Sequence, residues 1–515
     1  MIYEGHQITK ALNLTTHTLV IGSGAGGGVV SYNLAKAGVK TIVLEEGGRF
    51  QAKDMTQREE QMYPQLYRAG AQQFTSDGQI NVAQGSAFGG STLINAADVT
   101  PIEPEVLKHW QKHHSISEIT EATLAPSYKR VRQQIGAAKI QPNLINNNND
   151  LIIDAAKKQG LKADTFDSNR KNCIGSGYCM QGCAYDAKRG TNLSYLPQAS
   201  ELGADIYTDV RVDRIEKLKN GQYKIHATVI ERGLRTAIYP VEVIAKRVIL
   251  SAGAVHSPAI LKRSGLDKGL PQLGKNLSLQ PQMVVGAQFD ESRKMNSQRG
   301  IPQATYLSEY DDHNAEHGLG GYRIEGVGGV LSNMVGNFPG IGDQHKQLLK
   351  AYTHTHYSLL LIPDQPSGEI NWQWKDDGTV VPKIDYVLTE EWKARARDAV
   401  KNIGQFFFNA GAKRVYFSNN NFPVLESAAD LDKAQSFPIY PGVTTFISAH
   451  VQGTCRMGTN AQNSVVDQNL KLHTEDNIYV IDASIMPTSA STHTMLPIMA
   501  MADYAVHKML ASDES

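Results

Sequence analysis

The chain has 515 residues, of which 41% are hydrophobic and 20% are charged, a composition typical of globular proteins. This length exceeds what one hydrophobic core usually organises, which predicts two or more lobes. Lys plus Arg and Asp plus Glu both number 51, so the formal charge is zero and nothing predicts a nucleic-acid surface.

The expected location follows from what the sequence lacks. No apolar run reaches the roughly 18–20 residues that a transmembrane segment needs. The first ten residues, MIYEGHQITK, lack the basic and then apolar order of a signal peptide. We therefore expect a cytoplasmic protein, with peripheral association to a membrane left open.

The first predicted unit reads as strand, glycine turn and helix. An apolar run at 19–21 predicts a buried strand, and Gly22, Gly24 and Gly27 follow it in the pattern G-x-G-x-x-G. Gly22 permits a tight turn, Gly24 lets the backbone approach a pyrophosphate, and Gly27 lets helix and strand pack closely. A helical stretch follows whose first N–H groups would face the phosphates, and Ala25 is expected among the cofactor contacts.

A second predicted strand, residues 41–44, ends in Glu45. A carboxylate at this distance from the glycine turn can accept hydrogen bonds from a ribose. Because the strand, turn, helix, second strand and acidic residue occur in register, we predict dinucleotide binding. The glycine turn alone does not distinguish FAD from NAD.

Three further stretches carry turn and helix signals. Residues 85–95, GSAFGGSTLIN, form a loop whose glycines let the backbone pass close to a flat ring or a phosphate. Residues 251–266, SAGAVHSPAILKRSGL, predict a turn and a helix after a strand. Residues 477–510 predict a strand that ends at Asp482, a polar turn and a final helix.

Together these stretches resemble the glucose–methanol–choline (GMC) family of FAD-dependent oxidoreductases over nearly the whole chain. GGSTLIN is similar to the first family signature, and GAVHSPAILKRSG is similar to the second, although a final glycine is replaced by Leu266-Asp267. GKNLSLQP has Gln280 or Pro281 where a histidine is common. HVQGTCRMG and SVVDQNLKLH match the C-terminal portion of the family. The resemblance is greatest to the long-chain alcohol oxidase branch.

The resemblance implies an α/β fold. A Rossmann-like FAD-binding domain would be interleaved with an α+β substrate domain built on an antiparallel sheet. The implied FAD-binding domain comprises residues 1–98, 188–285 and 446–515, and the substrate-binding or cap domain comprises residues 99–187 and 286–445. Alternating strand patterns within the second part, with a hairpin turn at 376–379, agree with an antiparallel sheet.

The resemblance implies FAD as the cofactor and assigns its contacts. Besides the glycine turn and Glu45, the expected contacts are Gly90, Ser91 and Asn95 beside the isoalloxazine ring, Val212 at the adenine, Asp482 and Ala483 at the pyrophosphate and ribityl chain, and Thr494 and Met495 at the start of the final helix. Pro497 is acceptable in the first turn of that helix. The positive end of the helix would favour the anionic reduced flavin.

Family alignment brings two histidines, His450 and His493, to the catalytic face of the flavin. Alcohol oxidation removes the hydroxyl proton and moves a hydride to flavin N5, and an imidazole with a pKa of about 6.5 suits the proton. We expect His450 to be the base and His493 to orient the same substrate oxygen. Most histidines in a protein are ordinary core or surface groups, and His256 is interpreted as structural or flavin-adjacent.

Residues 172–191 hold three of the four cysteines, Cys173, Cys179 and Cys183. Three thiolates on one loop can hold an iron–sulfur cluster, and some membrane-bound sugar-dehydrogenase subunits of this family carry a similar insert. The long-chain alcohol oxidase resemblance instead favours reduced structural thiols. A disulfide is disfavoured by the compartment, and zinc by the spacing. We therefore assign no metal ligand and leave the cluster open, and we expect Cys455 to pack below the active site.

The predicted activity is FAD-dependent oxidation of an alcohol CH–OH group to a carbonyl, with an apolar primary alcohol favoured. Oxygen or an electron-transfer partner would reoxidise the flavin. One alternative is a dehydrogenase subunit that acts on a sugar or polyol with an iron–sulfur or other electron-transfer partner. The other is a lyase of the hydroxynitrile lyase type, which the cysteine-rich stretch disfavours. Five aromatic residues could line an apolar pocket, but their spacing fits core packing better: Trp372, Trp374, Phe406, Phe407 and Phe408.

Overall fold

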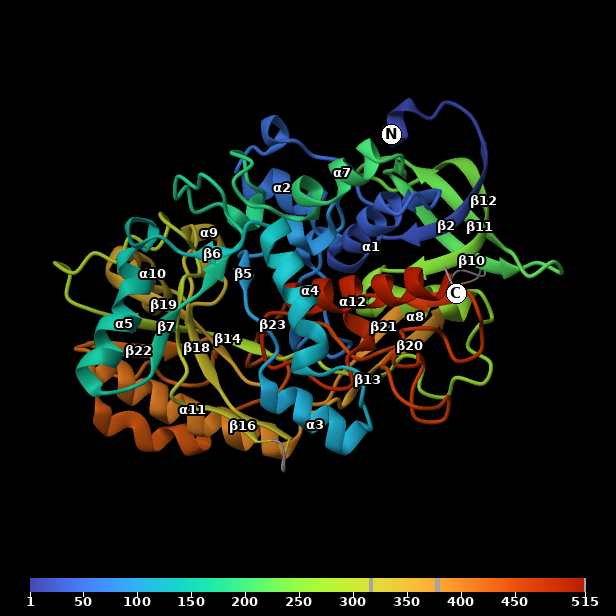
Figure 1. The fold of residues 1–515 in the computed structure, drawn as a ribbon. Coiled ribbons are helices and arrows are strands. Elements are labelled where there is room, and N and C mark those ends of the chain that lie inside the picture. The colour runs from blue at the N-terminus through green and yellow to red at the C-terminus, as the bar shows by residue number, and fades with distance from the viewer. Residues whose placement is uncertain (315–317, 376–379, 514–515) are drawn as a thin grey trace.

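Two large sheets of eight strands each dominate the structure (Figure 1). The structure is a computed structural model that describes residues 1–314, 318–375 and 380–513. The first sheet lies at the right of the view in Figure 1 and the second at the left. Within the described ranges, no helix is both long and apolar enough to cross a bilayer.

The predicted strand–turn–helix unit stands at the centre of the first sheet. β2 (Leu12–Ile21) leads through the glycine turn into α1 (Ala25–Lys36), and β3 (Thr41–Leu44) returns parallel to β2. The last residues of β2 are buried, as expected for a parallel strand covered on both faces. α1 packs against α12 (Met495–Asp513), the final helix.

The other strands of the first sheet come from three distant parts of the chain. They are β1 (Ile2–Tyr3), β9 (Asp205–Tyr207), β10 (Val210–Lys217), β11 (Tyr223–Ile230), β12 (Ala237–Leu250) and β24 (Ile478–Val480). The order is β1-β9-β3-β2-β12-β11-β10, with β24 paired to β12. β3, β2, β12 and β24 are parallel, so their carboxyl ends lie at one edge of the sheet.

The second sheet is almost wholly antiparallel. Its strands are β4 (Ile80–Val82), β7 (Ala163–Thr165), β14 (Gln282–Gln288), β15 (Thr305–Leu307), β18 (Arg323–Gly326), β19 (Thr355–Leu361), β22 (Arg414–Phe417) and β23 (Phe446–Ser448). The order is β4-β23-β14-β19-β18-β15-β7, with β22 paired to β14. Only β23 and β4 pair in parallel among these strands of the described chain.

Helices α5 (Asn147–Gln159) and α11 (Glu390–Asn409) flank the second sheet (Figure 1). Each begins at a side-chain cap, because the Asn146 amide oxygen accepts the N–H of Asn149 and the Thr389 hydroxyl accepts that of Trp392. The apolar face of α11 buries its aromatic residues, including Phe406 and Phe407, in the hydrophobic core of this half. The core-packing interpretation of these two residues therefore holds.

Smaller elements connect the two sheets. Three short strands, β13 (Lys275–Leu277), β20 (Gly368–Trp374) and β21 (Val380–Asp385), form a separate sheet, and the turn predicted at 376–379 lies outside the described residues. The remaining short strands are β5 (Asp98–Val99), β6 (Ala138–Lys139), β8 (Asp167–Ser168), β16 (Asp311–Asn314) and β17 (Gly318–Gly321). The remaining α-helices are α2 (Glu59–Leu66), α3 (Pro104–His114), α4 (Glu121–Gln134), α6 (Thr191–Ser194), α7 (Leu196–Glu201), α8 (Gly253–Arg263), α9 (Leu331–Val335) and α10 (Asp343–Lys350).

The chain passes between the two sheets several times. β4, β23 and the start of β14 fall in segments that the sequence assigns to the FAD-binding domain, yet they pair within the second sheet. One edge of the second sheet is thus built from those segments. The division of the chain into two domains stays a prediction.

Candidate active site

A cavity of about 1360 Å³ extends from the carboxyl edge of the first sheet to the second sheet. Residues expected at the cofactor line it: Gly22, Gly24, Ala25, Glu45, Gly90, Ser91, Asn95, Val212, Asp482, Ala483, Thr494 and Met495. Both predicted catalytic histidines, His450 and His493, line the same cavity. Of the predicted cofactor residues, Gly27 alone is not in the wall.

The three glycines of the turn differ in what a side chain at each position would meet. Gly22 has a φ of 97°, a left-handed conformation that favours glycine. A Cβ on Gly27 would lie 2.0 Å from the carbonyl oxygen of Gly22, so this glycine serves the packing of α1 on β2. A Cβ on Gly24 would meet only the Cα of Gly90, at 4.0 Å. Gly24 is therefore not required by protein packing and leaves space in the cavity.

Glu45 joins the two glycine loops. Its carboxylate accepts hydrogen bonds from the N–H and O–H of Ser23, at 2.9 and 2.6 Å, and from the N–H of Gly47, at 2.7 Å. The Ser23 hydroxyl oxygen in turn accepts the N–H of Gly89 at 2.9 Å. Burial raises the pKa of Glu45 above its ordinary value. The predicted ribose ligand is thus also part of the protein's own loop structure.

The cavity wall has polar atoms that the protein leaves unpaired. Gln84 Oε1, Asn95 Oδ1 and His256 Nε2 are buried and have no hydrogen-bond partner among the described residues. Such groups cost free energy unless a ligand or water satisfies them. Cavities for drug-sized ligands measure roughly 300–1,000 Å³, so this larger cavity suits a dinucleotide with a substrate beside it. The residues present therefore fit FAD.

The rings of His450 and His493 are in edge-to-face contact. Their centroids are 5.4 Å apart and their planes make an angle of 81°. His450 Nδ1 lies 2.8 Å from Gln280 Oε1 and 3.4 Å from Gln282 Nε2. Because the closer partner is an amide oxygen, Nδ1 carries the proton and Nε2 is left with a lone pair. Burial, and then the charge of His493, lower the pKa of His450 to about 3, so this ring is neutral.

His493 is held by protein groups on both sides of its ring. Nε2 lies 3.0 Å from Glu325 Oε2 and 3.9 Å from Asp98 Oδ2, and Nδ1 lies 3.5 Å from Thr100 Oγ1. Burial opposes protonation of the ring, but the charge and hydrogen bond of Glu325 and the charge of Asp98 outweigh it and raise the pKa of His493. Nε2 is thus directed at the carboxylates and Nδ1 at the Thr100 hydroxyl, while the ring itself lines the cavity.

Sequence reasoning did not identify three of these residues. Gln280 lies in the GKNLSLQP stretch where relatives commonly have a histidine, and that departure is the signal that could have found it. Asp98 and Glu325 lie on short strands with no motif around them. Their contact with His493 depends on long-range packing, which no local pattern records.

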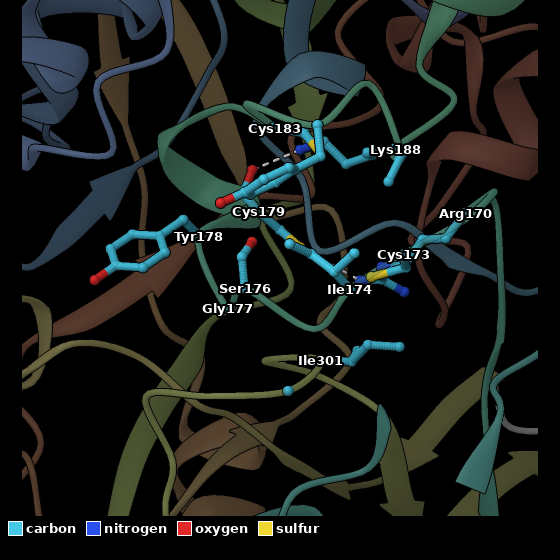
Figure 2. A pocket seen from close by; sticks show the side chains of 13 residues that line it. Arg170, Cys173, Ile174, Ser176, Gly177, Tyr178, Cys179, Cys183, Lys188 and Ile301 are labelled. Atoms are coloured by element: carbon cyan, nitrogen blue, oxygen red, sulfur yellow. Dashed lines mark hydrogen bonds between the residues drawn. The ribbon is translucent and has the colours of Figure 1, made fainter. Parts of the chain in front are cut away.

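The three clustered cysteines line one small pocket (Figure 2). Cys173, Cys179 and Cys183 share it with the side chains of Arg170 and Lys188. All four cysteines of the chain are free thiols. In the part of the chain that the structure describes, no three His, Cys, Asp or Glu side chains are grouped to hold a metal ion. Cys455 is fully buried in the core of the first half, as expected.

The cysteine loop is tied to the wall of the large cavity. Lys188 Nζ donates to the carbonyl oxygens of Cys179, at 2.6 Å, and Asn95, at 2.8 Å. Arg170 donates to the carbonyl oxygen of Ala96, and its Nη2 lies 3.8 Å from Cys179 Sγ. Asn95 and Ala96 both line the large cavity. The backbone of residues 95 and 96 therefore separates the thiols from the expected flavin site.

Comparison with known proteins agrees with this geometry. The models of the GMC oxidoreductase family match residues 63–282 with their N-terminal part and 364–502 with their C-terminal part. An uncharacterized GMC-type oxidoreductase of Mycobacterium tuberculosis is 30% identical over 94% of this chain and 74% of its own length. A long-chain-alcohol oxidase of Arabidopsis thaliana is 26% identical over 94% of this chain and 66% of its own.

A solved structure shows the same fold. The formate oxidase of Aspergillus oryzae superposes with a TM-score of 0.72 at 15% identity, covering 98% of this chain and 100% of the other. The fold and the matches define a flavoprotein oxidoreductase that binds FAD and acts on CH–OH donors. The chain belongs to the GMC oxidoreductase family. The family resemblance, fold class, enzyme class and cofactor inferred from the sequence are confirmed.

Proposed function

We propose that this enzyme oxidises an apolar primary alcohol to a carbonyl, with His450 as the base and His493 as its partner. The observation that carries the proposal is the position of His450 in the cavity wall, where Nδ1 lies 2.8 Å from Gln280 Oε1 and no described residue is hydrogen-bonded to Nε2. A neutral imidazole with a free lone pair can accept a hydroxyl proton.

Different residues of the cavity would hold the cofactor, accept the proton and orient the substrate. The cofactor would be held by the glycine turn, Glu45 and the other predicted contact residues that line the cavity. When bound, FAD supplies the acceptor for the hydride. His450 takes the hydroxyl proton at Nε2, while Gln280 keeps the ring in one tautomer and orientation. His493, from the same cavity wall, orients the substrate oxygen.

The wall beyond the histidines supports an apolar substrate. Val284, Leu359 and Ile447 line the cavity from the second sheet. The core-packing interpretation is wrong for Trp374, which lines the cavity and is 60% exposed, so that an aromatic ring lies where the cavity meets solvent. Apolar walls favour an alkyl chain, because each buried CH₂ contributes about 0.8 kcal/mol. The name of the Arabidopsis relative, a long-chain-alcohol oxidase, agrees with this substrate class.

The test is anaerobic mixing of the FAD-loaded enzyme with long and short primary alcohols, a polyol and a cyanohydrin. We expect the long alcohols to bleach the oxidised flavin band fastest. His450→Gln should slow bleaching by roughly 10²–10⁴-fold, whereas His226→Gln, a histidine paired with Glu216 on the first sheet, should not. No bleaching by any alcohol would overturn the proposal, and cyanohydrin cleavage without bleaching would favour the lyase.

A second candidate is a dehydrogenase acting on a sugar or polyol that passes electrons through an iron–sulfur cluster. Its support is that three thiols share a small pocket with Arg170 and Lys188, since two cations would offset the negative charge of a thiolate-bound cluster. Against it, no three ligand side chains among the described residues are grouped to hold one metal ion. Iron and acid-labile sulfide measured on anaerobically purified protein, with Cys179→Ser as the control, test it. Protein free of iron and sulfide would exclude this candidate and leave oxygen or another carrier as the electron acceptor.

A further inference from the structure

Two carboxylates lie buried behind His493 and converge on the same ring nitrogen. Glu325, on β18 of the second sheet, places Oε2 3.0 Å from Nε2 of His493. Asp98, on β5, places Oδ2 3.9 Å from the same atom. Each carboxylate side chain is only 1% exposed. The pair is assembled from strands more than two hundred residues apart in the chain, so its meeting at His493 is a product of the tertiary fold.

Asp98 contributes to the wall of the large cavity, but the oxygens of neither carboxylate are exposed there. Both oxygens of Asp98 are covered and have no hydrogen-bond partner among the described residues. Glu325 is not among the residues that line the cavity, and its Oε2 also accepts a hydrogen bond from Gln303. Because their oxygens are buried beside His493, we expect both carboxylates to act on a reaction through its ring.

When protonated, His493 is a cation within 4 Å of both carboxylates. Arg323 also lies near Glu325, but it forms an ion pair with Asp311. Despite burial, His493 and its hydrogen bond hold the pKa of Glu325 below its ordinary value. Asp98 faces His493, Arg170 and Lys188, with Glu325 as a like charge, and burial raises its pKa to about 7.

Among the residues that the structure describes, no carboxylate is hydrogen-bonded to the other histidine. His450 Nδ1 faces the amide oxygen of Gln280, and the rings of His450 and His493 are 5.4 Å apart. Two neighbouring imidazoles repel each other when both are charged, so the pair favours a state in which only one of the two rings takes up an additional proton and becomes a cation. The position of the carboxylates decides which ring carries it.

We propose that Glu325 and Asp98 are positioning residues that hold His493 as a cation beside a neutral His450. This assigns the two histidines of the proposed alcohol oxidation different tasks. The substrate oxygen gives its proton to His450 Nε2, and the adjacent carbon gives up the hydride that the cofactor accepts. His493 keeps its own proton throughout and stabilises the negative charge that develops on the oxygen.

The protonation states can be measured without turnover. Protein labelled with ¹⁵N-histidine is examined by NMR in the FAD-loaded form at about pH 8, above the ordinary imidazole pKa of about 6.5. His450→Gln and His493→Asn identify the two signals. We expect wild-type His493 to be doubly protonated and His450 to have one protonated nitrogen. In Glu325→Gln, His493 should become neutral at this pH.

Two NMR outcomes would overturn the proposal. One is a neutral His493 in the wild-type protein, and the other is a His493 that stays cationic in both Glu325→Gln and Asp98→Asn. Asp98→Asn provides a second variant should Glu325→Gln fail to fold. Because no substrate is present, these results stand even if the enzyme proves to act on no alcohol, in which case only the proposed function fails.

Kinetics then test the consequence for catalysis. Glu325→Gln should slow flavin reduction by roughly 10²-fold, as loss of a group that stabilises a developing oxyanion does, and should change the pH profile of that rate. Glu325→Asp, which keeps the charge, should restore part of it. The matched control is Glu475→Gln, whose carboxylate is 10% exposed and pairs with Tyr223 and Lys217. An unchanged rate and pH profile in Glu325→Gln would contradict the assigned role.

Discussion

Asp98 is a carboxylate whose two oxygens have no hydrogen-bond partner in the described part of the chain, and burial raises its pKa to about 7. The folded protein therefore binds a proton at Asp98 more tightly than the unfolded chain does. The stabilisation of the folded protein that comes from this tighter proton binding is fully present below about pH 4. It is lost as the pH rises to about 7.

Asp98→Asn should therefore be more stable than the wild type at pH 8, by on the order of 1–3 kcal/mol, but not at pH 4. Denaturant unfolding of both proteins across this range measures the difference. Glu46→Gln is the contrast, because the charge and hydrogen bonds of Arg68 hold the pKa of Glu46 below its ordinary value despite burial, so this variant should be less stable than the wild type at pH 8. A stability gap between Asp98→Asn and wild type that does not change with pH would contradict the argument.

Gln280 fixes the base through a single hydrogen bond to His450 Nδ1, at 2.8 Å. Gln280→Met keeps the length of the side chain but removes the acceptor, so the ring of His450 is free to turn. We expect flavin reduction to slow by roughly 10–100-fold through misorientation of the base, with unchanged FAD content. Stopped-flow reduction measures the rate, and a wild-type rate would show that Gln280 has no positioning role.

At the scale of elements, the glycine turn between β2 and α1 separates folding from cofactor binding. Gly27→Ala places a Cβ 2.0 Å from the carbonyl oxygen of Gly22, so it should destabilise the protein even without FAD. Gly24→Ala meets no atom closer than 4.0 Å and should fold normally but retain less FAD. Melting of the FAD-free proteins and FAD content after purification measure the two effects. Equal melting temperatures of the two variants would refute this separation.

The same elements show what sequence can predict. β2, α1 and β3 were predictable because glycine positions, apolar runs and the acidic end lie within thirty residues and are set by local rules. The family motifs brought His450 and His493 to one cavity. The carboxylate partners of His493 were not predictable, because Glu325 and Asp98 reach it only through the pairing of β18 and β5 with distant strands. Glu45 was expected as a ribose ligand, and its role in holding Ser23 and Gly47 depends on the folded loops.

At the scale of the molecule, the cavity is lined from both sheets and from the N-terminal turn of α12. A ligand that fills it should stabilise the two halves together. We expect excess FAD to raise the melting temperature of FAD-free protein in one transition, with a gain of about 2.7 kcal/mol at one hundred times its Kd. Differential scanning calorimetry measures this. Two transitions, of which only one responds to FAD, would show that the halves unfold independently.

The repeated crossing of the chain between its two sheets limits how the enzyme can be divided. β1, β2 and β3 precede β4, while β24 follows β23, so each sheet has strands at both ends of the sequence. A genetic cut anywhere between β4 and β23 leaves both sheets incomplete. Neither fragment alone could complete a sheet, so we expect each to stay unfolded until it meets the other. Two such fragments would suit a split reporter with little background signal.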